Sequence, residues 1–476
     1  MGSAPDLGLV LDEDAAARRA HALRRDLAAA GVRPGDRIAS VAGNGWGAIA
    51  ARDAAAADDL ILAPINPRLA PAEIAWLARH ARPRAIAVEP AYLEAVHAAA
   101  PHLPLIALDD RELAGPPLDL GRIGGTLLYT SGTTGRPKGC WRTAAQERAR
   151  TDELRASYAL AATDVHLIVC PLAHSAPGIF LRAARAVGAR TVVLARFDPA
   201  GLLAAIAHHR ATVIFLVPTQ IHRLLALPDD LRASFDLSSL RAVIVAGAPF
   251  PPATKRAAQA WLGAAILYEF YGSSETGTVS VIGPGDHDRH PGSVGRAPAG
   301  VDVQVRDVDG APVAPGEVGE LFVASPAVMA GYLDDDGANL VPRSSSLVSV
   351  GDLGRIDDGW ITLVDRKHDT IISGGQNVYP AEVERALAAH PAIAGAVVFG
   401  VDDPDWGQIV AAVLVARDQP LDGHALRDHL RADLAAYKLP RAVAWCAIDE
   451  LPIGSSGKAL RRAARAAFAA RLVPIT

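Results

Sequence analysis

The sequence predicts an α/β protein. A large N-terminal domain of parallel and mixed sheets with helices and a small β-rich portion is followed by a small α+β C-terminal domain. Short apolar runs, such as residues 37–43, 166–172 and 241–247, alternate with amphipathic Ala/Leu/Arg stretches. Strands that alternate with helices form parallel sheets covered on both faces. At 476 residues the chain also exceeds the usual size of one core, so more than one domain is expected.

Capping residues predict where helices of the N-terminal part begin and end. Residues 12–31 open with acidic side chains and close with Gly31. Asp198 precedes Pro199 as a cap and first-turn pair at the start of a second apolar stretch. Both patterns are typical of helices.

The residue pattern changes after about residue 296. Valines recur in alternation along residues 301–325, which also contain the turn pairs 309–310 and 315–316. This pattern predicts hairpins and gives the β-rich portion. Beyond a boundary at 365–369, a helix with Pro380 in its first turn is expected. Two apolar runs and a long Ala/Arg helix should follow it.

Composition excludes several classes of partner. With 47 Lys+Arg against 52 Asp+Glu the net charge is −5, which gives no general attraction to nucleic acid or acidic membranes. The three cysteines form no CxxC pair, which argues against a disulfide framework or a zinc knuckle. No signal peptide or apolar run of about 18 residues is visible, so we expect a cytoplasmic protein without a membrane span.

The stretch TSGTTGRPKG at 130–139 combines glycines, hydroxyls and two cations after an apolar strand. Glycines let backbone N–H groups converge on an anion, and hydroxyls add donors. It is not the Walker pattern, because Gly139 follows Lys138 where that motif has Ser or Thr. From these residues alone, a phosphate-binding loop and an ordinary surface turn both stay open.

Further segments resolve that choice. They are YGSSETG at 271–277, GDLGRID at 351–357, DRKHDTIISGGQNVYPAEVE at 365–384 and LPIGSSGKALRR at 451–462. Together with the loop, in this order and spacing, they resemble the adenylate-forming superfamily of acyl-CoA synthetases, adenylation domains and luciferases. Residues 217–249, and 271–277 followed by HPGSVGRA at 290–297, resemble most closely those of actinobacterial fatty-acyl or aromatic-acid CoA ligases.

The resemblance implies an ATP- and Mg²⁺-dependent ligase. It would activate an aryl or medium acyl acid as an acyl-AMP with release of pyrophosphate, then transfer the acyl group to CoA. The N-terminal domain, residues 1–365, would bind ATP and the acid. The C-terminal domain, residues 369–476, would be mobile about a hinge at 366–368, where His368 stands in place of the family's usual Asp or Lys.

The resemblance also assigns the nucleotide site. Tyr271 would stack on adenine, and Gly272 beside it counts among the nucleotide-binding residues. Asp352 would accept the ribose hydroxyls, and Arg366 would approach the ribose and phosphate. The opposite adenine wall would be formed by Gly247, Ala248 and Pro249. The β- and γ-phosphates would be held by Thr130, Ser131, Gly132, Thr133, Thr134, Gly135 and Lys138.

The residues of the reaction itself follow in the same way. Glu275 would bind Mg²⁺, a hard cation suited to carboxylate and phosphate oxygens, and Ser274 would touch the α-phosphate. Lys458 would lie between the substrate carboxylate and the α-phosphate during adenylation. Gly375 would let the pantetheine thiol pass the backbone, and His174 would gate the acyl channel.

Plainer interpretations accompany these assignments. Tyr271 and His174 could be core packing, Asp352 a cap, and residues 374–375 an ordinary turn. Two histidine pairs, 208–209 and the HDRH at 287–290, lack supporting metal ligands, so we expect them in surface loops.

The acceptor also stays open. A carrier-protein thiol on a separate chain, an amine or nitrite could replace CoA, and a non-catalytic nucleotide-binding relative is the alternative of another class. The expected partners are small molecules, with a monomer or homodimer as the assembly.

Overall fold

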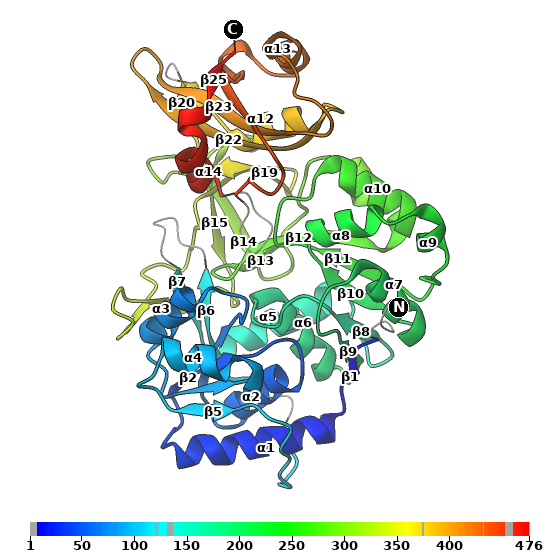
Figure 1. The fold of residues 1–476 in the computed structure, drawn as a ribbon, viewed down its shortest axis with the longest axis vertical. Helices are drawn as coiled ribbons and strands as arrows, with labels where there is room; N and C mark the ends of the chain where they lie inside the picture. The colour runs from blue at the N-terminus through cyan, green and yellow to red at the C-terminus, as the bar shows by residue number, and fades with distance from the viewer. Residues whose placement is uncertain are drawn as a thin grey trace. The chain divides into compact units, whose positions relative to one another are not determined.

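The computed structural model describes residues 7–119, 122–130, 137–373, 376–431, 433–452 and 460–475. The chain forms two compact units (Figure 1). The first runs through Val303 and includes Val323–Val348, and the second contains Gln304–Phe322 and the chain from Ser349 onward. The mixed α/β architecture predicted from the sequence is confirmed. The hinge at 366–368 falls within the sequence of the second unit and stays a prediction.

One sheet of the first unit has parallel strands at its centre and antiparallel strands at its edges. This order is typical of strands joined by covering helices. In spatial order the strands are β1 (Leu9–Val10), β9 (Arg190–Val193), β8 (Val165–Ile168), β10 (Val213–Leu216), β11 (Ala242–Val245), β12 (Leu267–Ser273) and β13 (Gly277–Ile282).

A second sheet of this unit joins five parallel strands to three antiparallel ones. The antiparallel part begins at the β6–β7 hairpin, which carries the predicted phosphate loop. In spatial order the strands are β17 (Leu340–Pro342), β16 (Gly331–Leu333), β7 (Lys138–Arg142), β6 (Gly125–Thr130), β3 (Ile61–Ile65), β2 (Arg37–Val41), β4 (Ala85–Val88) and β5 (Leu105–Ala107).

The helices of the first unit include the two that capping residues predict. Asp12 caps α1 by accepting from the Ala15 amide at 2.9 Å, and Asp198 caps α7 by accepting from Gly201 at 2.7 Å. The helices are α1 (Glu13–Ala29), α2 (Trp46–Ala57), α3 (Pro71–Ala81), α4 (Leu93–Ala99), α5 (Ala144–Ser157), α6 (Ser175–Ala186), α7 (Pro199–His209), α8 (Pro218–Leu225), α9 (Asp229–Ala233), α10 (Pro252–Leu262) and α11 (Asp286–Arg289).

Two further sheets are built mainly from residues of the second unit. One has the order β14 (Asp302–Arg306), β15 (Gly319–Ala324), β18 (Asp352–Asp357) and β19 (Trp360–Arg366). The other has the order β21 (Gln376–Val378), β20 (Ile371–Ser373), β23 (Gly407–Ala416), β24 (Ala442–Cys446) and β25 (Val473–Pro474), with β22 (Ile393–Asp403) also paired to β23. The turns expected at 309–310 and 315–316 are confirmed, since both glycines have φ of +82°.

The helices of the second unit are short. The predicted helix at Pro380 is confirmed as α12 (Pro380–Ala388), but the long Ala/Arg helix is wrong. Two short helices stand instead, α13 (Gly423–Arg431) and α14 (Arg461–Phe468). Strand β24 separates them and adds to the sheet between β23 and β25. Among the described residues, none of the helices is both long and apolar enough to cross a bilayer.

Candidate active site

The β6–β7 hairpin places the two ends of the predicted phosphate loop opposite each other. Thr130 pairs with Lys138 in the antiparallel register, so the last hydroxyl of β6 lies beside the first cation of β7. The loop residues between them, Ser131, Gly132, Thr133, Thr134 and Gly135, lie outside the described residues.

The Glu275 turn, residues 273–277, joins β12 to β13. The strand register shifts between Tyr271 and Gly272, and a Cβ on Gly272 would lie 2.2 Å from the Gly277 carbonyl oxygen. Only glycine therefore fits there. Ser273 Oγ accepts from the amides of Glu275 and Thr276, both at 3.1 Å, a local bond that stabilises a tight turn.

The Glu275 carboxylate is 7% exposed and faces the hairpin. Its Oε1 accepts from Thr130 Oγ1 at 2.8 Å and from the Tyr332 hydroxyl at 3.2 Å. Burial and the nearby carboxylate both raise the pKa of Tyr332, so its hydroxyl stays a donor. The Tyr332 ring also lies under the ammonium group of Lys138, 5.6 Å from nitrogen to centroid.

This carboxylate fits a magnesium ion carried by a nucleotide. Among the described residues both bonds fall on Oε1, which leaves Oε2 for a cation. No group of three or more His, Cys, Asp and Glu side chains gathers in the part of the chain that the structure describes. A bound Mg²⁺ would therefore take most of its ligands from phosphate and water, the usual arrangement for this ion.

Other predicted residues follow the carboxyl ends of the parallel strands. His174 comes after β8, Gly247 after β11, and Tyr271 stands near the end of β12. The parallel pairing of β11 with β12 ends at Val245 and Glu269. Gly247 and Tyr271 each lie two residues beyond this last pair along their own strand direction. Carboxyl ends of parallel strands meet at one edge, where α/β sheets bind ligands. Gly247 has φ of +90°, a conformation that favours glycine.

His174 stands at the N-cap position of α6, where its side chain makes no capping bond. It is exposed, so the alternative of a core histidine is wrong. Part of the side chain reaches solvent, but the protein packed around the rest of it lowers the pKa by desolvation, so the neutral ring predominates at pH 7.

Two other expectations about histidines are wrong. His209 and His287 lie on helices and are buried, not in surface loops. His209 Nε2 is 2.7 Å from the Leu7 carbonyl oxygen and His287 Nε2 is 3.3 Å from that of Leu267. Each ring thus has a backbone carbonyl beside its Nε2, a pairing that the sequence does not reveal, whereas the buried Nδ1 of His287 has no hydrogen-bond partner among the described residues.

The second unit places Asp352 and Arg366 together. They face each other across β18 and β19, and Arg366 Nε lies 3.2 Å from Asp352 Oδ1. The two residues assigned to the ribose are thus neighbours within this unit.

The remaining predicted residues, Gly375 and Lys458, lie outside the described residues. The chain on both sides of the Lys458 segment is tied down, because the Leu460 amide donates to the Pro452 carbonyl at 2.9 Å. Arg461 then donates to Asp369 at 2.8 Å and to Glu384 at 2.6 Å.

Sequence reasoning missed Arg142 and Tyr332. Arg142 donates through Nε to the Ser274 carbonyl at 2.8 Å and through its terminal nitrogens to the Ser274 and Ala327 carbonyls. The available signal was a second cation, Arg142, two residues after Cys140 in the short strand that begins with Lys138. Alternation puts both side chains on the same face.

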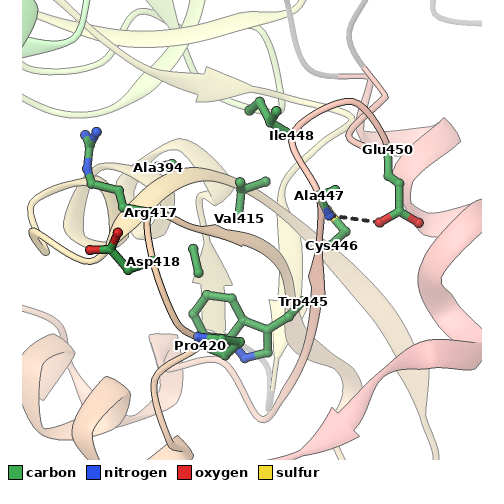
Figure 2. A pocket seen from close by; sticks show the side chains of 11 residues that line it. Ala394, Val415, Arg417, Asp418, Pro420, Trp445, Cys446, Ala447, Ile448 and Glu450 are labelled. Atoms are coloured by element: carbon green, nitrogen blue, oxygen red, sulfur yellow. Dashed lines mark hydrogen bonds between the residues drawn. The ribbon is translucent and has the colours of Figure 1, made fainter.

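A surface cavity of about 730 Å³ lies in the second unit (Figure 2). Trp445, Cys446 and Ile448 contribute to its lining, and the Ala447 amide donates to Glu450 at 2.8 Å beside it. None of the predicted site residues lines this cavity, so the assignment of the active site does not depend on it.

Comparison with known proteins agrees with this arrangement. The AMP-binding enzyme family model matches residues 13–333, and that of the AMP-binding enzyme C-terminal domain matches 382–458. Feruloyl-CoA synthase of an Amycolatopsis species is 34% identical over 461 residues, 95% of this chain and 92% of that protein.

Two solved structures share the fold over nearly the whole chain. Amide bond synthetase McbA from Marinactinospora thermotolerans has a TM-score of 0.85 and 31% identity, covering 95% of this chain and 94% of that one. The o-succinylbenzoate CoA synthetase of Bacillus subtilis, in complex with its acyl-adenylate intermediate, has a TM-score of 0.83 and 28% identity, covering 94% and 91%. The chain therefore belongs to the AMP-binding enzyme family and is an adenylate-forming acid ligase, as its motifs predict.

Proposed function

We propose that this ligase activates an aromatic or medium-chain acid through the residues predicted above and passes the acyl group to the thiol of CoA. The similarity to feruloyl-CoA synthase supports an aromatic acid and a CoA acceptor. The observation that carries the assignment of the site is the bond between Thr130 and Glu275. It joins the end of a hydroxyl-rich loop to a carboxylate suited to a cation, from two segments 145 residues apart.

In the first half-reaction an oxygen of the acid attacks the α-phosphorus of ATP. The bond from that phosphorus to the bridging oxygen breaks, and pyrophosphate leaves. Magnesium, when bound, neutralises phosphate charge and orients the leaving group. Lys138 and the loop hydroxyls hold the β- and γ-phosphates, and Glu275 keeps one carboxylate oxygen for the cation. Fixed positive groups at these points offset the charge of two anions that must meet.

Lys458 supplies the mobile positive charge of this step and Ser274 a hydroxyl for the α-phosphate. The C-terminal domain then turns about 366–368, and the CoA thiol passes Gly375. The thiol sulfur bonds to the acyl carbon, the bond from that carbon to AMP breaks, and the thiol proton is released to solvent. His174, neutral at pH 7 because its pKa is lowered, borders the acyl channel without adding charge to it.

Replacement of the lysine tests its role. We expect Lys458→Ala to lower adenylate formation by a factor of about 10³, because the charge acts in the transition state, while ATP binding changes little. Pyrophosphate release and equilibrium ATP binding measure the two effects separately. Near-normal pyrophosphate release by this variant contradicts the assignment.

One experiment tests the overall proposal. The protein is incubated with ATP, Mg²⁺ and a library of aromatic, fatty and amino acids, with CoA, with nitrite, with amines or with no acceptor, and products are identified by mass spectrometry. Aryl or medium acyl thioesters in the CoA arm support the proposal. Pyrophosphate release with no thioester contradicts the CoA step, and ATP left intact with every acid contradicts catalysis.

An amine acceptor is the second candidate. McbA, which shares the fold at 31% identity, is named an amide bond synthetase. Amides in the amine arm that exceed thioesters in the CoA arm favour it.

A cytoplasmic location is part of the proposal. The three cysteines are free thiols, as in a reducing compartment. We further propose a monomer or homodimer that uses a carrier protein, if any, as a separate chain. Size-exclusion chromatography with light scattering measures the assembly.

A further inference from the structure

We propose that Arg142 is a positioning residue of the metal site, which holds the Glu275 turn in the shape that presents its carboxylate to the cation. The inference depends on the proposed role of Glu275. Its basis is the set of bonds between strand β7 and the Ser274 carbonyl.

The Ser274 carbonyl receives an unusual number of donors. Arg142 Nε donates to it at 2.8 Å, a terminal nitrogen of the same side chain donates as well, and Cys140 Sγ donates at 3.2 Å. Burial raises the pKa of the Cys140 thiol to about 12, so the sulfur stays protonated and remains a donor. Both side chains project from the same face of β7.

These bonds fix one peptide plane. The Ser274 carbonyl and the Glu275 amide belong to the same planar group, and the amide donates to Ser273 Oγ at 3.1 Å. The plane is therefore held at both ends. The Glu275 carbonyl accepts from the Met329 amide at 2.8 Å, which fixes the backbone on the other side of this residue as well.

Arg142 also bonds to the segment that contains Met329, whose amide donates to Glu275. A second terminal nitrogen of Arg142 donates to the Ala327 carbonyl, two residues before Met329. A single guanidinium group thus holds the turn and the neighbouring segment 327–329, and the rigid fork of arginine suits two carbonyls at once.

Stability alone does not explain this side chain. Arg142 is 0% exposed, and burying a cation is often no more stabilising than an apolar residue of similar volume. Arg142 contributes charge near the buried Glu147, but its hydrogen bonds to the Ser274 and Ala327 carbonyls make a geometric contribution as well. Strand β7 begins with Lys138 and ends with Arg142. The same five residues therefore carry the lysine proposed to bind phosphate and the arginine that holds the turn bearing the Glu275 carboxylate.

The variant Arg142→Lys tests the inference, since lysine keeps the charge and loses the fork. Mn²⁺ replaces Mg²⁺ as a paramagnetic probe, and electron paramagnetic resonance measures its affinity for the enzyme–ATP complex without turnover. We expect the dissociation constant to rise about tenfold, the lower end of the usual effect of a residue that orients a metal ligand.

Arg182→Lys is the matched control. Arg182 is mostly buried and pairs with Glu147, but none of its described bonds reaches the Glu275 turn. We expect a similar loss of melting temperature and less than a twofold change in metal affinity. A change equal to that of Arg142→Lys would mean that loss of stability alone explains the effect, and would overturn the inference.

Two further variants keep the test decisive if Arg142→Lys folds poorly. Cys140→Ala removes only the weakest donor to Ser274, and we expect a two- to threefold weaker metal affinity. In a Glu275→Gln background the same change should add nothing, because both variants act on one contact. Additive effects, or wild-type affinity in Cys140→Ala and Arg142→Lys, overturn the inference.

The same measurements distinguish the role of Arg142 from that of Glu275. Weakened metal binding in Glu275→Gln with normal binding in Arg142→Lys contradicts the role of Arg142 alone. Normal binding in both variants contradicts the proposed metal site itself.

Discussion

Two centres of buried charge, one in each unit, have opposite composition. The Glu147 centre comprises Glu147 with Arg142, Arg150 and Arg182, and the Arg461 centre comprises Arg461 with Asp365, Asp369 and Glu384. The first has one carboxylate among guanidinium groups, with Arg150 at 3.7 Å. The second has one guanidinium among carboxylates, at 3.7, 2.8 and 2.6 Å from the three acids in the order above.

The difference decides how each centre responds to pH. Burial alone would raise the pKa of Glu147, but the surrounding arginines lower it to about 2. Burial also raises the pKa values of Asp365 and Glu384, and there the single Arg461 does not reverse the shift. The single carboxylate of the first centre is thus strongly stabilised by the arginines around it. The carboxylates of the second centre share one arginine, so their negative charge is only partly compensated.

The largest expected effect on stability comes from replacing Glu147, the single acid of its centre. We expect Glu147→Gln to lower the free energy of unfolding at pH 7 by about 3–5 kcal/mol, because buried cations lose their counter-charge. A folded-state pKa below the unfolded value stabilises above about pH 4.5, and this stabilisation is lost as the pH falls toward 2. Urea unfolding should therefore show a smaller difference from wild type at pH 3.5 than at pH 7, and equal differences contradict the comparison.

The corresponding change in the second unit is smaller. Arg461→Met should destabilise by about 2 kcal/mol, since it removes charge-assisted bonds from a partly exposed site. Raised pKa values mean that the folded state is most stable with the acids protonated, so the loss should be largest at pH 7 and shrink toward pH 4. Thermal unfolding against pH measures this. The neighbouring Arg462→Met is the control, since Arg462 is exposed, and a similar loss there would contradict the account.

A buried titratable group with no charge centre sharpens the comparison further. His166 is 1% exposed, and neither ring nitrogen has a hydrogen-bond partner among the described residues. Burial lowers its pKa to about 4, so wild-type stability falls as the pH drops from about 6.5 toward 4. His166→Leu should change stability by less than about 1 kcal/mol at pH 7 and should relatively stabilise the protein at pH 5. An unchanged pH profile would contradict the shift.

Local signals in the sequence predicted much of the fold. Asp12 and Asp198 act within three residues of their own position, and a capping bond at that range can be read from spacing. The long C-terminal helix was wrong because Ala and Arg favour helices locally, whereas strand β24 gains its hydrogen bonds from β23, about 30 residues earlier. A local sequence pattern does not show whether such distant strand pairing will outweigh local helix propensity.

The candidate site likewise contains residues that short motifs predict and residues that act only through long-range contacts. The hydroxyls, glycines and Glu275 form short motifs whose chemistry can be read directly. Arg142 acts on a carbonyl 132 residues away, and Tyr332 reaches Glu275 from a third segment. These contacts exist only once three parts of the chain pack together, and the sequence alone gives an isolated arginine and tyrosine.

Isotope transfer tests the central claim most directly. The acid that the library identifies is labelled with ¹⁸O in both carboxylate oxygens and consumed with ATP, Mg²⁺ and the acceptor, and the AMP is analysed by mass spectrometry. Attack of the acid on the α-phosphorus predicts AMP with one ¹⁸O and unlabelled pyrophosphate. Unlabelled AMP, or ¹⁸O in inorganic phosphate, would contradict an acyl-adenylate and with it the account of the site.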